Sequence, residues 1–233
     1  MHVFYTPAID TNPELPEEEA GHCLRVLRLG MGDEIMLTDG KGCFHRAVIT
    51  ADTGKRCQVK IVETLPQEKG WNGWLHIAMA PTKNMDRTEW FAEKLTEMGF
   101  DELSFLNTRY SERRVIKTER IQKILVSAVK QSLKATVPVL NEMTDFKRFV
   151  EQDFSGQKFI AHCHEGEKPL LKEVLVPGED ALVLIGPEGD FSEEEVALAV
   201  SKGFQSISLG TSRLRTETAA LVAGFTLNLM NQK

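Results

Sequence analysis

The chain has 233 residues, long enough for one large domain or for a small domain followed by a medium one. Apolar residues make up 42% of it and charged residues 27%, the balance of an ordinary globular protein with a buried core. A formal net charge of −6 excludes a protein that coats nucleic acid through bulk positive charge, so any nucleic-acid site must be a local basic surface.

The amino terminus and the cysteines indicate a compartment. Residues 1–7 carry neither the basic segment nor the apolar run of a signal peptide, and no segment reaches the roughly eighteen apolar residues of a membrane span. The cysteines are scattered and form no Cys-x-x-Cys pair: Cys23, Cys43, Cys57 and Cys163. We therefore expect a cytoplasmic protein with no membrane partner.

The pattern over residues 1–68 predicts a small β-rich domain. A short helix is expected at Glu17–Leu27, directly after Pro16. Three strands are then expected at Glu34–Thr38, Cys43–Ala51 and Arg56–Glu63, separated by glycine-containing turns. The polar segment 64–70 contains proline and glycine and is predicted to be a linker.

Residues 72–233 alternate between short apolar strands and helices. Strands are expected at Leu75–Ala80, Glu102–Asn107, Val137–Leu140, Lys158–His162, Ala181–Ile185 and Ser206–Leu209. Helices are expected at Asp86–Met98, Glu119–Lys134, Asp145–Gln152, Pro169–Leu175, Glu193–Lys202 and Thr216–Met230. This order predicts an α/β domain with a mostly parallel sheet and helices on both faces.

Two of these strands end in glycine-containing loops that lead into helices. The first loop is Ile185-Gly186-Pro187-Glu188-Gly189, and the second starts at Leu209-Gly210 and leads to Thr216. Glycine lets backbone approach a ligand closely, and open α/β sheets bind ligands outside the carboxyl ends of their strands. We expect the two loops to share one cofactor pocket.

The charges around the first loop indicate the kind of ligand. Ser192 and Glu195 have the spacing of a capping box, so the helix start is well specified. A phosphate would be repelled by Glu188, Asp190 and the glutamates of that first turn, whereas a cationic or neutral ligand such as S-adenosylmethionine suits them. The alternative is that the loop is only a tight turn that leads into a well-capped helix.

Basic residues are concentrated between Arg109 and Lys134. This segment holds eight lysines and arginines against two glutamates, and Tyr110 offers a ring that can stack on a base. His22, Arg25 and Arg28 form a second series, spaced every three residues. Both series predict RNA contacts, and the alternative for each is an ordinary solvated surface.

The segment His162-Cys163-His164-Glu165 contains metal-binding side chains. Alternate residues at a strand end point the same way, but no third ligand with suitable spacing follows. No metal is predicted.

The helix expected at Thr216–Met230 is apolar on more than one face. Such a helix must be buried on several sides, in a large core or against another chain. We expect a homodimer through this helix.

Together these segments resemble a known family. Leu184–Gly189 and the Leu-Gly-x3-Leu-Arg-Thr-Glu-Thr-Ala run at 209–219 are similar to the motifs of the bacterial small-subunit (16S) ribosomal RNA uridine-N3 methyltransferases, which are of the knotted SPOUT class. Similarity continues upstream at residues 22–28, 32–33, 93–99, 111–113 and 128–132. The chain departs from the family at Leu133 and Lys134, where glycine and arginine are usual, so a planar bidentate contact is lost at Lys134.

The resemblance implies a fold, a cofactor and partners. The fold is a PUA-like RNA-binding barrel over 1–68 and a methyltransferase domain over 72–233, whose parallel sheet is tied in a trefoil knot at about residues 160–220. The implied S-adenosylmethionine contacts are His162, Cys163, Ile185, Gly186, Pro187, Glu188, Gly189, Leu209, Gly210 and Leu214. The implied contacts to 16S rRNA in the small ribosomal subunit are His22, Arg25, Arg28, Arg109, Arg113, Arg114, Lys130 and Lys134.

Methylation of uracil N3 requires an unpaired or flipped base and loss of the N3 proton. The enzyme must align N3 with the cofactor and stabilise the uracil anion, and Arg215 is predicted to do this because it lies beside the second loop. Glu217 or Glu188 is predicted to accept the proton, unless the carboxylate only pairs with Arg215. Two other functions stay open: a non-catalytic RNA-binding or ribosome-assembly factor, and a SPOUT methyltransferase that modifies a ribose or another RNA position.

Overall fold

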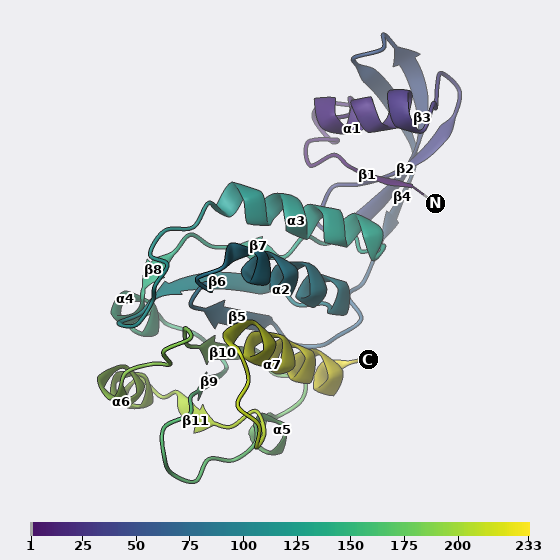
Figure 1. Ribbon diagram of the computed structural model, residues 1–233. Helices are drawn as coiled ribbons and strands as arrows, with labels where there is room; N and C mark the ends of the chain where they lie inside the picture. Colours follow the sequence, from purple (N-terminus) through teal and green to yellow (C-terminus); the bar gives the residue numbers. More distant parts are fainter. Residues whose placement is uncertain (1) are drawn as a thin grey trace. The chain divides into compact units, whose positions relative to one another are not determined.

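The computed structural model describes residues 2–233, which divide into two compact units (Figure 1). The first unit holds the residues up to Lys69 together with Leu125–Val137. The second holds Gly70–Ile124 and Pro138–Lys233. The segment 125–137 therefore folds with the amino-terminal residues, although it lies far from them in sequence.

The first unit contains a four-stranded sheet in the order β1-β2-β3-β4. Its strands are β1 (Val3–Tyr5), β2 (Glu34–Thr38), β3 (Cys43–Asp52) and β4 (Cys57–Pro66). β1 pairs in parallel with β2, and the other pairs are antiparallel. Along β3 the buried residues His45, Ala47 and Ile49 alternate with more exposed ones, because one face of the strand covers the core and the other meets solvent.

Two features of this sheet differ from the sequence-based expectation. The linker predicted at 64–70 begins as strand, since Thr64, Leu65 and Pro66 pair with His45, Phe44 and Cys43. β4 lies at the edge of the sheet, so a proline at its end removes no ladder hydrogen bond. Strand β1 was not predicted, because three residues whose partner lies some thirty residues later carry no local signal.

The helix expected at Glu17–Leu27 has two parts. Helix α1 covers Glu17–Gly21, and one π-helical turn, η1, covers His22–Val26. Arg28 follows with φ of 57°, a conformation that is uncommon for a residue with a side chain. Short π-helical turns are frequent at functional sites, which draws attention to this segment.

The second unit is built on a seven-stranded sheet in which every pair is parallel. The main path runs β11-β9-β10-β5-β6-β7, and β8 pairs with β6. The strands are β5 (Leu75–Met79), β6 (Glu102–Asn107), β7 (Val139–Leu140), β8 (Thr144–Asp145), β9 (Gln157–Ala161), β10 (Ala181–Ile185) and β11 (Gln205–Ile207). The predicted mostly parallel sheet is confirmed, and only the two-residue strand β8 was not foreseen.

Helices follow the strands as expected from the sequence. They are α2 (Met85–Met98), α3 (Thr118–Gln131), α4 (Phe146–Val150), α5 (Leu171–Val174), α6 (Glu193–Ser201) and α7 (Thr216–Asn231). The predicted capping box forms at α6, where Ser192 Oγ accepts from the Glu195 N–H and Glu195 accepts from the Ser192 N–H. Helix α3 ends three residues before the predicted Lys134, because Leu133 takes a positive φ of 54°.

Both faces of the central strand β10 are covered. Leu182 and Leu184 belong to a core cluster with Phe146 of α4 and Ala199 of α6. The alternate residues of the strand, which point to the opposite face, are buried as well, and α7 packs against β5 and β10. Helices α2 and α7 lie side by side (Figure 1). Because helices cover both faces of this parallel sheet, the loops after β9, β10 and β11 all emerge at the same edge of it.

Candidate active site and cofactor pocket

A pocket of the second unit with a volume of about 1120 Å³ lies at the carboxyl ends of three neighbouring strands. Its walls are the loop after β9 (161–168), the loop after β10 (185–190) and the segment from the end of β11 into α7 (207–219). These loops meet because β11, β9 and β10 are adjacent in the sheet, and parallel strands end at the same edge. The two loops singled out from the sequence do share one pocket.

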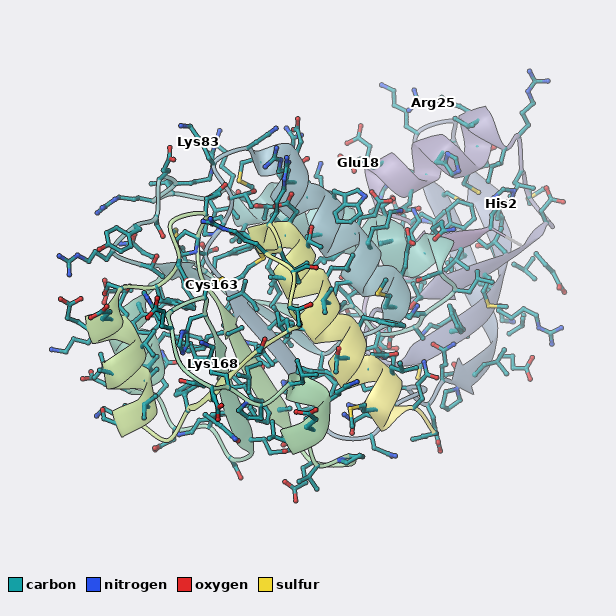
Figure 2. The ribbon with its side chains drawn as sticks, turned by 60° about the horizontal axis from the view of Figure 1, so that its bottom comes forward. His2, Glu18, Arg25, Lys83, Cys163 and Lys168 are labelled. Carbon is teal, nitrogen blue, oxygen red and sulfur yellow. The ribbon has the colours of Figure 1, made fainter. Side chains whose placement is uncertain are left out.

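The first two loops are tied together by hydrogen bonds. The backbone N–H of Cys163 donates to Asp190 Oδ2 at 2.7 Å, and His164 Nε2 donates to the Phe191 carbonyl at 2.7 Å. Lys168 Nζ donates to the carbonyl of His164. Figure 2 labels Cys163 and Lys168, which both line the pocket. Asp190 therefore shapes the pocket by holding one wall to the next.

His162 is the polar group of the pocket that most needs a ligand. Both ring nitrogens are buried, yet neither has a hydrogen-bond partner in the part of the chain that the structure describes. Burial, followed by the positive charge of Lys168, lowers the pKa of His162, so the ring is neutral at pH 7. A buried polar group without a partner is costly unless something supplies one. His162 is therefore prepared to bond a molecule that enters the pocket.

The glycines of the site have different environments. Gly210 has φ of +134° and no atom within 4 Å of where a side chain would begin, so a ligand can approach its backbone. A Cβ on Gly186 would lie 3.0 Å from the Phe191 nitrogen, which shows that this turn is closely packed. Gly189 faces Tyr110, whose Cβ would lie 3.0 Å from a Cβ at position 189. Gly189 is thus not in the pocket wall, unlike the other cofactor-contact candidates, and its predicted contact stays a prediction.

The predicted catalytic residues are placed differently from one another. Glu188 lines the pocket, and its Oε1 accepts from the Lys83 N–H at 2.9 Å. Arg215 lines the pocket and is exposed. Glu217 is 7% exposed and does not line the pocket. The ion pair that the sequence offered between Glu217 and Arg215 is replaced by one with Arg87, whose Nε lies 3.8 Å from Glu217 Oε1.

Arg87 lines the pocket, although sequence reasoning did not select it. It is contributed by α2, whereas every other residue in the pocket wall comes from residues 161–219. Helical spacing gives a weak hint, since Arg87 is four residues before the buried Phe91 and lies near that face. Nothing in the local sequence predicts that α2 packs beside α7.

Two of the basic residues predicted to bind RNA, Arg109 and Arg113, make hydrogen bonds within the second unit. Arg109 is held by α6, because its Nη1 donates to Glu194 at 2.9 Å and its backbone N–H donates to Glu195 at 2.8 Å. Arg113 donates to the carbonyls of Thr82 and Lys83. Both guanidinium groups thus make protein contacts.

The other predicted RNA contacts differ in exposure. Arg114 is exposed, and Tyr110 is 48% exposed with the Arg109 guanidinium 5.6 Å from its ring centroid. In the first unit, Lys130 pairs with Glu19 at 2.5 Å, and Lys134 is half-buried. The remaining candidates, His22, Arg25 and Arg28, are exposed on or just after η1, and Figure 2 marks Arg25 there.

Residues 2–233 contain neither a metal-binding cluster nor a membrane-spanning helix. No group of three or more His, Cys, Asp or Glu side chains is arranged to hold a metal ion. No helix within that range is long and apolar enough to cross a membrane.

Comparisons with known proteins identify the class of this fold and pocket. A model of the RNA methyltransferase domain matches residues 69–228, and a model of the RNA methyltransferase PUA domain matches residues 15–62. Ribosomal RNA small subunit methyltransferase E of Synechocystis sp. is 30% identical over 232 residues, covering 95% of this chain and 74% of the relative.

Solved structures agree with that class along the whole chain. The crystal structure of a probable rRNA-methyltransferase from Porphyromonas gingivalis is 43% identical, with a TM-score of 0.94 and coverage of 99% of this chain and 98% of that one. Ribosomal RNA small subunit methyltransferase E of Neisseria gonorrhoeae, solved with S-adenosyl methionine bound, is 27% identical with a TM-score of 0.86, and the match covers 98% and 97% of the two chains. The chain belongs to the RNA methyltransferase family that the small subunit methyltransferase E proteins represent.

Proposed function

We propose that this protein methylates N3 of a uridine in 16S rRNA of the small ribosomal subunit, with S-adenosylmethionine as the methyl donor. The observation that carries the proposal is the pocket at the ends of β9, β10 and β11, where a neutral His162 lacks partners in the described chain and Gly210 leaves backbone open. Family membership supplies the reaction class. The choice of N3 rests on the sequence motifs.

The residues of the pocket fit S-adenosylmethionine. The volume of about 1120 Å³ exceeds what one drug-sized ligand needs, so a nucleoside cofactor and a flipped base both have room. The ring nitrogens of His162 can bond the adenosine or the amino-acid part, and the open backbone at Gly210 permits a close approach. Leu209 and Leu214 supply apolar wall, and Glu188 and Asp190 supply the negative charge that a sulfonium favours.

When bound, the cofactor supplies a methyl group activated by a positively charged sulfur. The chain must then hold N3 in line with that group and stabilise the negative charge that uracil gains as its proton leaves. Arg215 lines the pocket and makes no side-chain hydrogen bond within residues 2–233, so it is available to the base. Glu188 is the better placed of the two candidate proton acceptors, because Glu217 does not line the pocket.

The accessible basic residues support an RNA-binding role for the first unit. We propose that His22, Arg25 and Arg28 contact the RNA backbone from the π-helical turn η1 and the residue that follows it. Arg114, Lys130 and Lys134 remain proposed contacts. Arg109, Arg113 and Lys130 would have to exchange the protein partners described above for RNA.

Four further features belong to the proposal. The domains are taken as residues 1–68, a PUA-like barrel, and 72–233, with a trefoil knot at about 160–220. The convergence of loops 161–168, 185–190 and 207–216 on one pocket supports the knot.

A homodimer through α7 is supported by two apolar side chains there, Phe225 at 43% and Leu229 at 54% exposed. The cytoplasm is the compartment that the proposed substrate implies.

The test is methyl transfer from labelled S-adenosylmethionine to small ribosomal subunits that lack the modification, followed by nucleoside mass analysis. Label in 3-methyluridine is the expected result. Subunits that already carry the modification are the matched control and should take up no label. Label in another nucleoside would move the proposal to a different base or ribose, and cofactor binding without transfer to this RNA would contradict the substrate.

A further inference from the structure

The pocket is charged differently on its two sides. On the side of the loop after β10, Asp190 accepts from two backbone N–H groups, those of Cys163 and Phe191, and Glu188 accepts from Lys83. On the side of α2 and α7, the wall contains Arg87 and Arg215, and two further basic side chains, Arg213 and Lys168, also line the pocket. The amino end of α7 also lies on that side and adds its partial positive charge. The first side suits a cation, and the second suits an anion.

Among residues 2–233, the one charged partner of the Arg87 side chain is Glu217. Its Nε is 3.8 Å from Glu217 Oε1, which is an ion pair but too long for a hydrogen bond. Its side chain is 40% exposed, whereas that of Glu217 is 9% exposed. Within residues 2–233 the guanidinium of Arg87 donates no hydrogen bond, so its five N–H groups remain available.

Glu217 gives independent support for a ligand near Arg87. Its second oxygen, Oε2, is buried and has no hydrogen-bond partner among the residues that the structure describes. Burying a carboxylate in this way is costly unless its charge holds another group in place. The neighbouring group with charge to compensate is Arg87, so Glu217 fixes where that guanidinium can go.

We propose that Arg87 binds a carbonyl oxygen of the target uracil and that Glu217 is the residue that positions Arg87, not the proton acceptor. The proposal rests on the proposed function. As N3 loses its proton, negative charge spreads onto O2 and O4, the two oxygens on either side of N3. Arg87 and Arg215 approach the pocket from different elements, so each can bind one of these oxygens. During transfer the N3–methyl carbon bond forms, the carbon–sulfur bond breaks with its electron pair left on sulfur, and the N3 proton goes to Glu188.

The arrangement also accounts for base selectivity. Cytosine carries an amino group in place of O4. An amino group and a guanidinium are both hydrogen-bond donors, so they cannot bond to each other. A site in which Arg87 and Arg215 each face one of the two positions, O2 and O4, therefore accepts uracil and rejects cytosine.

The first experiment compares Arg87→Gln, Arg87→Lys and Glu217→Gln with Arg148→Gln, an exposed arginine of α4 outside the pocket, as the matched control. With saturating S-adenosylmethionine, kcat for methyl transfer should fall about 100-fold in Arg87→Gln and about tenfold in both Arg87→Lys and Glu217→Gln. Cofactor affinity by calorimetry should stay within about twofold in all variants. The double variant Arg87→Gln/Glu217→Gln should be no slower than Arg87→Gln, because Glu217 acts through Arg87.

Three results would overturn the proposal. A tenfold or larger loss of cofactor affinity in Arg87→Gln with kcat retained would assign Arg87 to the carboxylate of the cofactor. Unchanged kcat and KM would remove Arg87 from the site. Multiplicative losses in the double variant would give Glu217 a role of its own, such as that of the base.

The second experiment does not need turnover. The Nε–H signal of Arg87, identified by its absence in Arg87→Lys, is followed in protein saturated with S-adenosylhomocysteine. Uridine 5′-monophosphate should shift this signal and cytidine 5′-monophosphate should not, whereas equal shifts would mean phosphate binding and would refute the base contact. If the wild-type protein failed to methylate 16S rRNA, the proposed function would fall, and this titration would still decide the role of Arg87.

Discussion

Buried polar groups at the two edges of the parallel sheet in the second unit differ in whether they have hydrogen-bond partners. At the amino ends of β5 and β6, His76 Nε2 is 2.8 Å from Ser104 Oγ, and Asn141 donates to both Ser104 and Glu102. Trp74 Nε1 also donates to Glu102, at 2.7 Å. Here each polar group has partners within the chain.

At the carboxyl edge, by contrast, polar groups are left without partners. Both ring nitrogens of His162 and one oxygen of Glu217 are buried and have no hydrogen-bond partner within residues 2–233. His76, at the other edge of the same sheet, is buried as well, so burial alone does not mark a functional histidine. A saturated network stabilises the fold, whereas an unsaturated one indicates where a ligand binds.

The largest expected effect is on turnover at the carboxyl edge. Arg215→Ala removes a guanidinium from the pocket wall and should lower kcat by about 100- to 1000-fold while changing cofactor affinity little, because the charge acts on the transition state. Steady-state kinetics with small-subunit RNA and calorimetry with S-adenosylmethionine measure the two quantities. Unchanged turnover would exclude Arg215 from the mechanism.

The next effect is on cofactor binding. Gly210→Val places a side chain in the pocket at a residue with φ of +134° and should weaken S-adenosylmethionine binding by at least about 100-fold. Gly54→Val is the matched control, since Gly54 also has a positive φ, +76°, and open space around it but lies in a turn of the first unit. The control should lose stability and keep cofactor affinity. Similar affinity in the two variants would contradict the placement of the cofactor against Gly210.

At the amino edge of the sheet, we expect His76 to make the free energy of unfolding depend on pH. Burial, opposed in part by the charge of Glu102, lowers the pKa of His76 to about 4 in the folded protein. Between about pH 4 and 6.5 the unfolded chain then binds more protons, so the free energy of unfolding should rise with pH across this range, by up to about 3 kcal/mol. Denaturant unfolding at several pH values measures the slope. His76→Gln should flatten it and leave cofactor affinity unchanged, and a retained slope would assign the effect to another group.

The smallest expected effect is at His162. His162→Ala should weaken S-adenosylmethionine binding by about tenfold, the equivalent of one hydrogen bond, and should not lower the free energy of unfolding of the free protein, because no partner is lost. Calorimetry and denaturant unfolding test both parts. A large loss of stability with unchanged affinity would make His162 a structural residue like His76 and would remove the contrast between the two edges.

Several parts of this protein could be predicted from the sequence. The strand at Ala181–Ile185 and the capping box of Ser192 and Glu195 were located correctly because apolar runs and helix starts are encoded within a few residues. The pocket between the two glycine loops was also foreseen, since parallel strands end at the same edge of a sheet. The family could be recognised because its motifs are local and ordered along the chain.

What the tertiary structure alone decided is which distant residues meet. Arg87 on α2 enters a pocket built from residues 161–219, and Glu217 pairs with it instead of Arg215. The fold also decided that β1 pairs with β2 and that the segment 125–137 joins the first unit. Periodicity, turn chemistry and capping act over a few residues, so the sequence determined the elements and their loops. The packing of one element on another depends on contacts between residues far apart in the chain, which no local pattern records.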